Sequence, residues 1–274
     1  MPNKQTRIIL IGDVMGRHGR RLLQKLLPAI RSAFKPDVVL ANGENSAGGL
    51  GINRRTADEI FSAGVDVITG GNHIWDKKEA LELLKIEKRI LRPLNFPADA
   101  PGSGSFVYTT AAGVPVLALS LQGRVFMEPV VDNPFNCVDR FLKTLGQGMP
   151  LLVIVDFHAE ATAEKQAMGF FLAGRVSAVL GTHTHVPTAD CHILDGGTAF
   201  QTDVGMTGSL DSIIGMKKEP IITKFVTGIN QRFDVEKENM ILDMTVVDVD
   251  NVSGRALRIE AFRYHEETYG QQLP

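Results

Sequence analysis

The segment Arg7-Ile8-Ile9-Leu10-Ile11-Gly12-Asp13 decides how the rest of the sequence is interpreted. Its uninterrupted apolar run is rich in β-branched side chains, which favours a strand that is buried on both faces. Gly12 and Asp13 then predict a turn directly after the strand. In open α/β sheets, ligands bind beyond the carboxyl ends of the strands, so Asp13 is a candidate for chemistry.

Short apolar runs and amphipathic stretches alternate along the sequence after this first strand. Helices are predicted over residues 20–34, 54–63, 77–86 and 160–172. Strands are predicted over residues 37–41, 65–69, 105–108, 114–119, 151–157 and 176–180, and again over 198–202, 240–248 and 256–263. An α/β beginning followed by β-rich segments predicts an α/β fold in which two packed β-sheets are flanked by helices.

Composition narrows the class of protein. With 44% hydrophobic and 22% charged residues among 274, and no linker or low-complexity tract, the sequence predicts a single globular domain over residues 1–274. A net charge of -2 argues against binding of long duplex nucleic acid. The absence of any long apolar run argues against a membrane span, and we expect a cytoplasmic protein. Cys137 and Cys191 leave room for one disulfide but not for a disulfide framework.

Polar side chains capable of binding metal follow nearly every predicted strand of the α/β pattern. Taken singly, each is more often a cap or a hydrogen-bonded polar residue. Together they form a mixed nitrogen and oxygen donor set typical of a transition-metal centre, and they exceed what one ion takes from a protein. The candidate metal ligands are Asp13, Glu44, Asn45, Asn72, His158, His183 and His185. Because none is a cysteine, an open reactive site is favoured over a closed structural zinc site.

The order of these motifs resembles that of the calcineurin-like metallophosphoesterases, and more closely their YmdB-like branch. The segments that carry the resemblance are residues 12–16, 42–49, 71–76, 156–162, 181–186 and 202–208. In this sequence Met15 stands where the superfamily usually has a metal-binding histidine, and Glu44 stands where it has a bridging aspartate. The resemblance implies a four-layer α/β/β/α sandwich and two metal ions, iron or manganese, with zinc as the alternative.

The same resemblance implies how the ligands are shared. One ion would bind Asp13, Glu44, Asn45 and His185, and the other would bind Glu44, Asn72, His158 and His183, so that Glu44 bridges them. Asn45 would replace the missing imidazole. A hydroxide held between the ions would attack the phosphate, and His73, which is free of the ions, would protonate the leaving group as general acid. Asp76 would either orient His73 or cap the next helix.

The expected substrate is a small phosphate diester, with 2',3'- or 3',5'-cyclic AMP implied by the resemblance. A phosphomonoesterase, including a protein phosphatase, an RNA nuclease and a non-catalytic, metal-dependent nucleotide sensor are the alternatives. A nuclease is less favoured because aromatic residues make up only 7% of the sequence. Residues 121–136 and 203–218 are expected to border the pocket or a subunit contact, and a homo-oligomer is left open.

Overall fold

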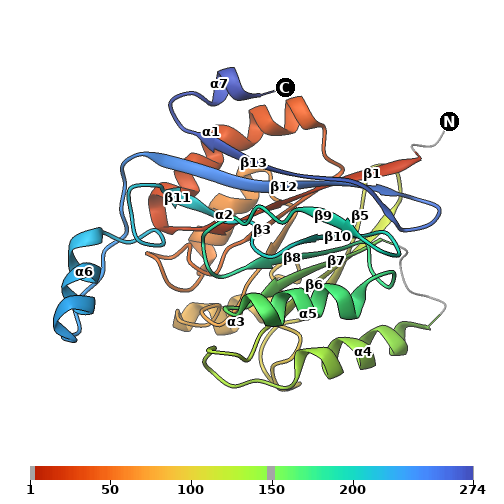
Figure 1. Cartoon of the computed structure of the whole chain (residues 1–274), viewed down its shortest axis with the longest axis horizontal. Helices are drawn as coiled ribbons and strands as arrows, with labels where there is room; N and C mark the ends of the chain where they lie inside the picture. Colours follow the sequence, from red (N-terminus) through yellow and green to blue (C-terminus); the bar gives the residue numbers. More distant parts are fainter. Residues whose placement is uncertain (1–3, 147–151, 274) are drawn as a thin grey trace.

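The computed structural model describes residues 4–146 and 152–273, and it contains two β-sheets (Figure 1). The first sheet has the order β2-β11-β12-β1-β3-β4, and β13 also pairs with β12. Its strands are β1 (Gln5–Ile11), β2 (Asp13–Val14), β3 (Val38–Asn42), β4 (Val67–Thr69), β11 (Met206–Ser209), β12 (Met240–Asp250) and β13 (Ala256–His265). The second sheet, β5-β6-β7-β8-β10-β9, consists of β5 (Ser105–Thr109), β6 (Pro115–Gln122), β7 (Leu152–His158), β8 (Ala178–Thr182), β9 (His192–Leu194) and β10 (Thr198–Gln201).

Helices cover the two outer faces of these sheets, except α6, which projects away from them (Figure 1). They are α1 (Gly16–Phe34), α2 (Arg54–Ala63), α3 (Lys78–Ile86), α4 (Pro134–Leu145), α5 (Thr162–Leu172), α6 (Lys218–Thr227) and α7 (Tyr269–Gln272). The α2 helix begins where the sequence provides a capping box. The Asn53 side chain accepts a hydrogen bond from the Thr56 amide, and the Thr56 hydroxyl accepts one from the Asn53 amide.

Successive side chains of β1 point to opposite faces of the first sheet, and this explains why the sheet is covered on both faces. Ile9 and Ile11 pack with leucines of α1, whereas Ile8 and Leu10 face the second sheet and contact its strands through a separate core. A third core joins the outer face of β6 and β7 to α4 and α5. The apolar run Ile8 to Ile11 is therefore buried on both faces, and the predicted four-layer α/β/β/α fold with two packed sheets is confirmed.

The carboxyl-terminal strands join the first sheet. β12 pairs antiparallel with β1 from Gln5↔Asp250 to Ile11↔Met244, while β1, β3 and β4 run parallel. In the second sheet β6, β7, β8 and β10 are parallel. Parallel strands end at one edge of their sheet, and side chains after β1, β3, β4, β7 and β8 meet there.

Several elements differ from the prediction. The α1 helix begins at Gly16, one turn before residue 20, and α4 begins within the predicted loop 121–136 because Pro134 occupies the first helical turn. The strands β2, β9 and β11 and the helices α6 and α7 were not predicted. Cys137 and Cys191 are both free, so the one disulfide that the sequence allowed is not formed. No helix in the described ranges is long and apolar enough to cross a membrane.

Candidate active site

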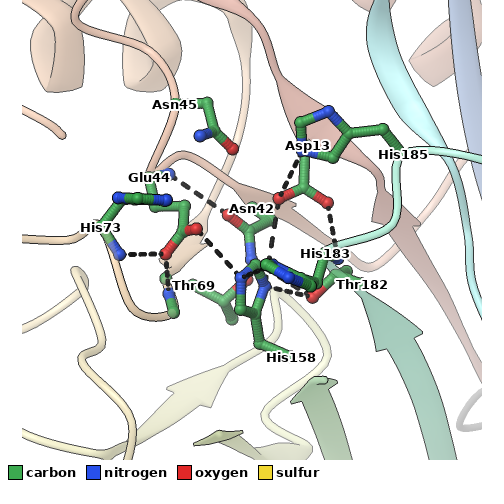
Figure 2. A network of polar contacts seen from close by, with 12 residues as sticks. Asp13, Asn42, Glu44, Asn45, Thr69, His73, His158, Thr182, His183 and His185 are labelled. Atoms are coloured by element: carbon green, nitrogen blue, oxygen red, sulfur yellow. Dashed lines mark hydrogen bonds and ion pairs between the residues drawn. The ribbon is translucent and has the colours of Figure 1, made fainter. Parts of the chain in front are cut away.

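An open cavity of about 260 Å³ lies where the strand ends of the two sheets meet. Its wall includes Glu44, Asn45, His73, His183 and His185, all predicted site residues. Figure 2 shows side chains from both sheets pointing toward one another, with Asp13, Glu44 and His73 from the first sheet and His158, His183 and His185 from the second. Of the remaining predicted residues, Asp13 and His158 contact side chains of this wall, and Asn72 contacts His158.

One cluster of donors surrounds the Nε2 atom of His158. This atom lies 2.9 Å from Glu44 Oε1, 3.1 Å from Asn72 Oδ1 and 3.0 Å from His183 Nδ1. One ligand atom from each of Glu44, His158 and His183 can be chosen so that all lie within 4.8 Å of one another. A single proton on His158 cannot satisfy three acceptors, whereas a cation can bind all these lone pairs at once, so the geometry fits a metal ion.

A second cluster lies around Asp13, which is fully buried. The Oδ1 atoms of Asp13 and of Asn45 are both buried without a hydrogen-bond partner among the described residues. The Asn45 amide nitrogen donates to Gly49 O at 3.0 Å, which fixes the orientation of its free oxygen. His185 Nε2 lies 3.6 Å from Asp13 Oδ1, beyond hydrogen-bonding distance. Buried oxygens without partners are costly, and these two fit a bound cation.

The charges of the two clusters also favour a cation. Burial alone would lower the pKa of His158, but the carboxylates of Glu44 and Asp13 raise it to about 9. Burial would raise the pKa of Asp13, yet the neighbouring His185 and His158 hold it well below its ordinary value. Burial and the charge of His158 lower the pKa of His183. The Asp13 carboxylate thus stays ionised, which favours positive charge at this point of the molecule.

A buried polar layer beneath His158 fixes the orientation of its ring. The Thr182 hydroxyl donates to Asp156 Oδ1 at 2.6 Å, so its oxygen accepts from His158 Nδ1–H at 2.9 Å. Asp156 Oδ2 accepts further from the Thr69 hydroxyl and the Asn42 amide. This arrangement leaves His158 Nε2 facing the donor cluster. No role was predicted for these residues from the sequence, although Asn42, Asp156 and Thr182 belong to the segments that carry the resemblance. Thr69, the last residue of a predicted strand, gave no signal.

Gly71 permits the His158 ring to approach the backbone. A Cβ atom placed on Gly71 would lie 2.0 Å from His158 Cδ2, far inside van der Waals contact. The Gly71 amide donates to Glu44 Oε2, as does the His73 amide at 3.1 Å. The glycine therefore holds a carboxylate with its amide and accommodates an imidazole against its Cα.

The turn that carries His183 and His185 is strained. Both residues have positive φ, 101° and 63°, which non-glycine residues rarely adopt. A buried ion pair holds the turn: Lys165 Nζ lies 2.6 Å from Asp203 Oδ2 and donates to Thr182 O at 2.8 Å, and the Thr184 amide donates to the same Asp203 oxygen at 3.1 Å. Strain of this kind is typical of functional sites.

His73 lies on the cavity wall with its side chain 34% exposed. Its Nδ1 atom is 2.8 Å from Asp76 Oδ2, while the residue that caps α3 is Lys77. Of the two roles considered for Asp76, the structure thus favours orientation of His73 over helix capping. Ile214 and Met216 from the predicted border segment 203–218 also line the cavity, and Met15 is buried beside them.

Comparisons with known proteins agree with this architecture. The sequence profile described as YmdB-like protein matches residues 9–262. The 2',3'-cyclic-nucleotide 2'-phosphodiesterase of Bacillus subtilis (strain 168) is 42% identical over 261 residues, which cover 95% of this chain and 98% of the relative.

Two solved structures superimpose over almost the whole chain. A phosphatase from Mycoplasma pneumoniae gives a TM-score of 0.91 at 34% identity and covers 97% of this chain and 95% of its own. A protein from Thermus thermophilus gives a TM-score of 0.88 at 42% identity and covers 95% of this chain and 99% of its own. The chain therefore belongs to the YmdB-like protein family, as the resemblance of its motifs predicted.

Proposed function

We propose that this protein is a dinuclear-metal phosphodiesterase that hydrolyses small phosphate diesters, and that cyclic nucleotides such as 2',3'- or 3',5'-cyclic AMP are its substrates. The observation that carries the proposal is the set of nitrogen and oxygen donors that converge from both sheets with buried oxygens left unpartnered. These donors lie at the floor of an open cavity. The named activity of the 42% identical relative supports the substrate class.

The two clusters correspond to two ions. Asp13, Glu44, Asn45 and His185 would hold one ion, and Glu44, Asn72, His158 and His183 would hold the other. Glu44 Oε2 already accepts two backbone amides, which fix the carboxylate in place. We propose iron or manganese, with zinc as the alternative, because this donor set suits each of them. When bound, the ions would activate water as the nucleophile and neutralise the charge of the phosphate.

His73 would donate the proton that the leaving group needs. Its Nδ1 atom is engaged by Asp76, which leaves Nε2 as the ring nitrogen that can reach a substrate. A carboxylate at Nδ1 fixes the tautomer and the orientation of the ring. A general acid is required for an alkoxide leaving group and serves no purpose in a nucleotide sensor, which favours an enzyme over a sensor.

The cavity also favours a small substrate. Its volume of about 260 Å³ is close to the lower end of ligand sites, and its open wall includes apolar Leu50, Ile214 and Met216 beside the polar floor. These apolar groups can contact a nucleoside while the phosphate faces the donors. We also propose that the protein is cytoplasmic. The molecular mass of the protein in solution would show whether it forms a homo-oligomer.

The test combines metal analysis with a substrate panel. Purified protein reconstituted with iron or manganese would be assayed on 2',3'-cyclic AMP, 3',5'-cyclic AMP, a phosphomonoester and a short RNA. We expect two ions per chain and the fastest turnover on a cyclic nucleotide. Preference for the monoester would assign a phosphatase, preference for RNA would assign a nuclease, and a metal-loaded protein inactive on every ester would leave the sensor alternative.

A further inference from the structure

In each of His158, His183 and His185, one ring nitrogen faces away from the donor clusters. The three residues differ in the oxygen atom that this nitrogen contacts. His158 Nδ1 lies 2.9 Å from the Thr182 hydroxyl, and His185 Nδ1 donates to Ile214 O at 2.9 Å. Both are buried. His183 is turned the other way: its Nδ1 faces His158, and its Nε2 lies 3.2 Å from Glu160 Oε2. Each imidazole thus has one nitrogen toward the clusters and one nitrogen on an oxygen.

Glu160 is unlike the other two partners because it is exposed. Its side chain is 47% exposed and forms part of the cavity wall, in the turn between β7 and α5. An exposed ion pair is ordinarily worth little to stability. Here the carboxylate lies beside the His183 imidazole, which must direct Nδ1 at the donor cluster. The carboxylate can therefore determine which ring nitrogen carries the proton, even if it adds nothing to the free energy of folding.

We propose that Glu160 is a positioning residue for His183: its carboxylate accepts the Nε2–H and thereby keeps the Nδ1 lone pair directed at Glu44 and His158. The inference deepens the proposed function, on which its metal-binding consequence rests. The turn that carries His183 is held through backbone groups of Thr182, His183 and Thr184, and these contacts do not fix the rotation of the His183 ring. In metal sites, carboxylates in this position orient the ligand imidazole and raise its basicity.

The first test measures metal affinity rather than turnover. Apo protein prepared with a chelator would be titrated with Mn²⁺ by calorimetry for the wild type, Glu160→Ala and Glu160→Gln. Removal of such a partner typically weakens metal binding by about 10- to 100-fold, so we expect that loss at one of two sites in Glu160→Ala. Glu160→Gln should retain most of the affinity, because its amide oxygen accepts the same hydrogen bond.

A matched control is Glu82→Ala on α3. Glu82 is also an exposed carboxylate in an ion pair, with Lys85 Nζ at 2.6 Å, and it lies outside the site. Its removal should leave Mn²⁺ affinity unchanged. Thermal unfolding of the apo proteins should be the same for all variants, since both carboxylates are exposed. A lower melting temperature for both Glu160→Ala and Glu160→Gln, with Glu82→Ala unchanged, would overturn the proposal in favour of a structural role.

The second test is independent of metal and of activity. Long-range ¹H–¹⁵N spectra of the imidazole rings in the apo protein, with His183 assigned from a His183→Gln variant, report which nitrogen carries the proton. We expect the Nε2–H form in the wild type and in Glu160→Gln, and a mixture in Glu160→Ala. An Nδ1–H form in the wild type, or an unchanged tautomer in Glu160→Ala, would overturn the proposal. A protein that keeps the predicted tautomer but binds no Mn²⁺ would contradict the proposed function while supporting the positioning role.

Discussion

Replacement of Gly71 by alanine should displace a proposed metal ligand without touching any donor atom. The added Cβ would lie 2.0 Å from His158 Cδ2, and ordinary contact begins at 3.4 Å. The Gly71 backbone cannot retreat freely because its amide is held by Glu44. The His158 ring must therefore move by about 1.4 Å in a close-packed interior, and a misplacement of about 1 Å commonly costs on the order of 100-fold in rate.

The assay for Gly71→Ala is metal content together with turnover of a cyclic nucleotide. We expect the ions per chain to fall from two to one or fewer, and turnover to fall at least about 100-fold. Overpacking should also lower the unfolding free energy of the apo protein by about 1–3 kcal/mol. Gly270→Ala is the control, because nothing lies within 4 Å of its added Cβ and neither glycine has positive φ. A Gly71→Ala protein with two ions and full turnover would refute the proposed role of His158.

Three further predictions concern single side chains. His73→Ala should keep both ions but lose about 10²- to 10⁴-fold in turnover on a nucleoside diester, and much less on a diester of an acidic phenol, since that leaving group needs no proton; equal slowing of both, with chemistry rate-limiting, contradicts the general-acid role. Glu44→Gln should weaken retention of both ions, measured by metal analysis after dialysis; full retention would show that Glu44 does not bridge. Burial raises the pKa of Glu59, but the hydrogen bonds and charges of Arg20 and Arg55 together outweigh burial, so this pKa lies below its ordinary 4.5. The stabilisation by the Glu59 carboxylate is therefore present above pH 4.5 and is lost as the pH falls below that value. Unfolding measured at several pH values should give a higher free energy of unfolding for the wild type than for Glu59→Gln at pH 7, and equal values for the two proteins in acid.

The sequence predicts the elements whose signals are local. Ile8 to Ile11 are apolar on both faces, and this alone indicates a strand between two layers. The α2 helix has the predicted bounds, residues 54–63, because Asn53, which caps it, and Gly64, which closes it, are its immediate neighbours in the sequence. Single polar residues after strands also indicate where the site lies. That the whole chain forms one domain stays a prediction.

Other features depend on contacts between distant segments. β2 and β11 are too short for any periodicity to appear, and they exist because Met206 and Thr207 pair with Asp13 and Val14. The partners of Asp156 come from β3, β4 and β8, so its role follows only from how the two sheets pack. The local sequence of β12 likewise does not indicate that this strand pairs with β1 and β11.

The donor clusters combine segments that are far apart along the chain, and this determines when a metal can be captured during folding. The His183 amide donates to Asp13 across 170 residues, and β1, which leads to Asp13, has its place in the sheet interior only once β12 has paired with it. Contacts of such sequence separation form late, because closing long loops costs entropy before the contacts can repay it. A chain emerging from the ribosome that has reached only Asn72 would carry Asp13, Glu44 and Asn45 but none of the histidine donors. Metal uptake should therefore follow the docking of the two sheets, and an ion bound between them would join the first strand of the protein to a turn encoded more than halfway along it.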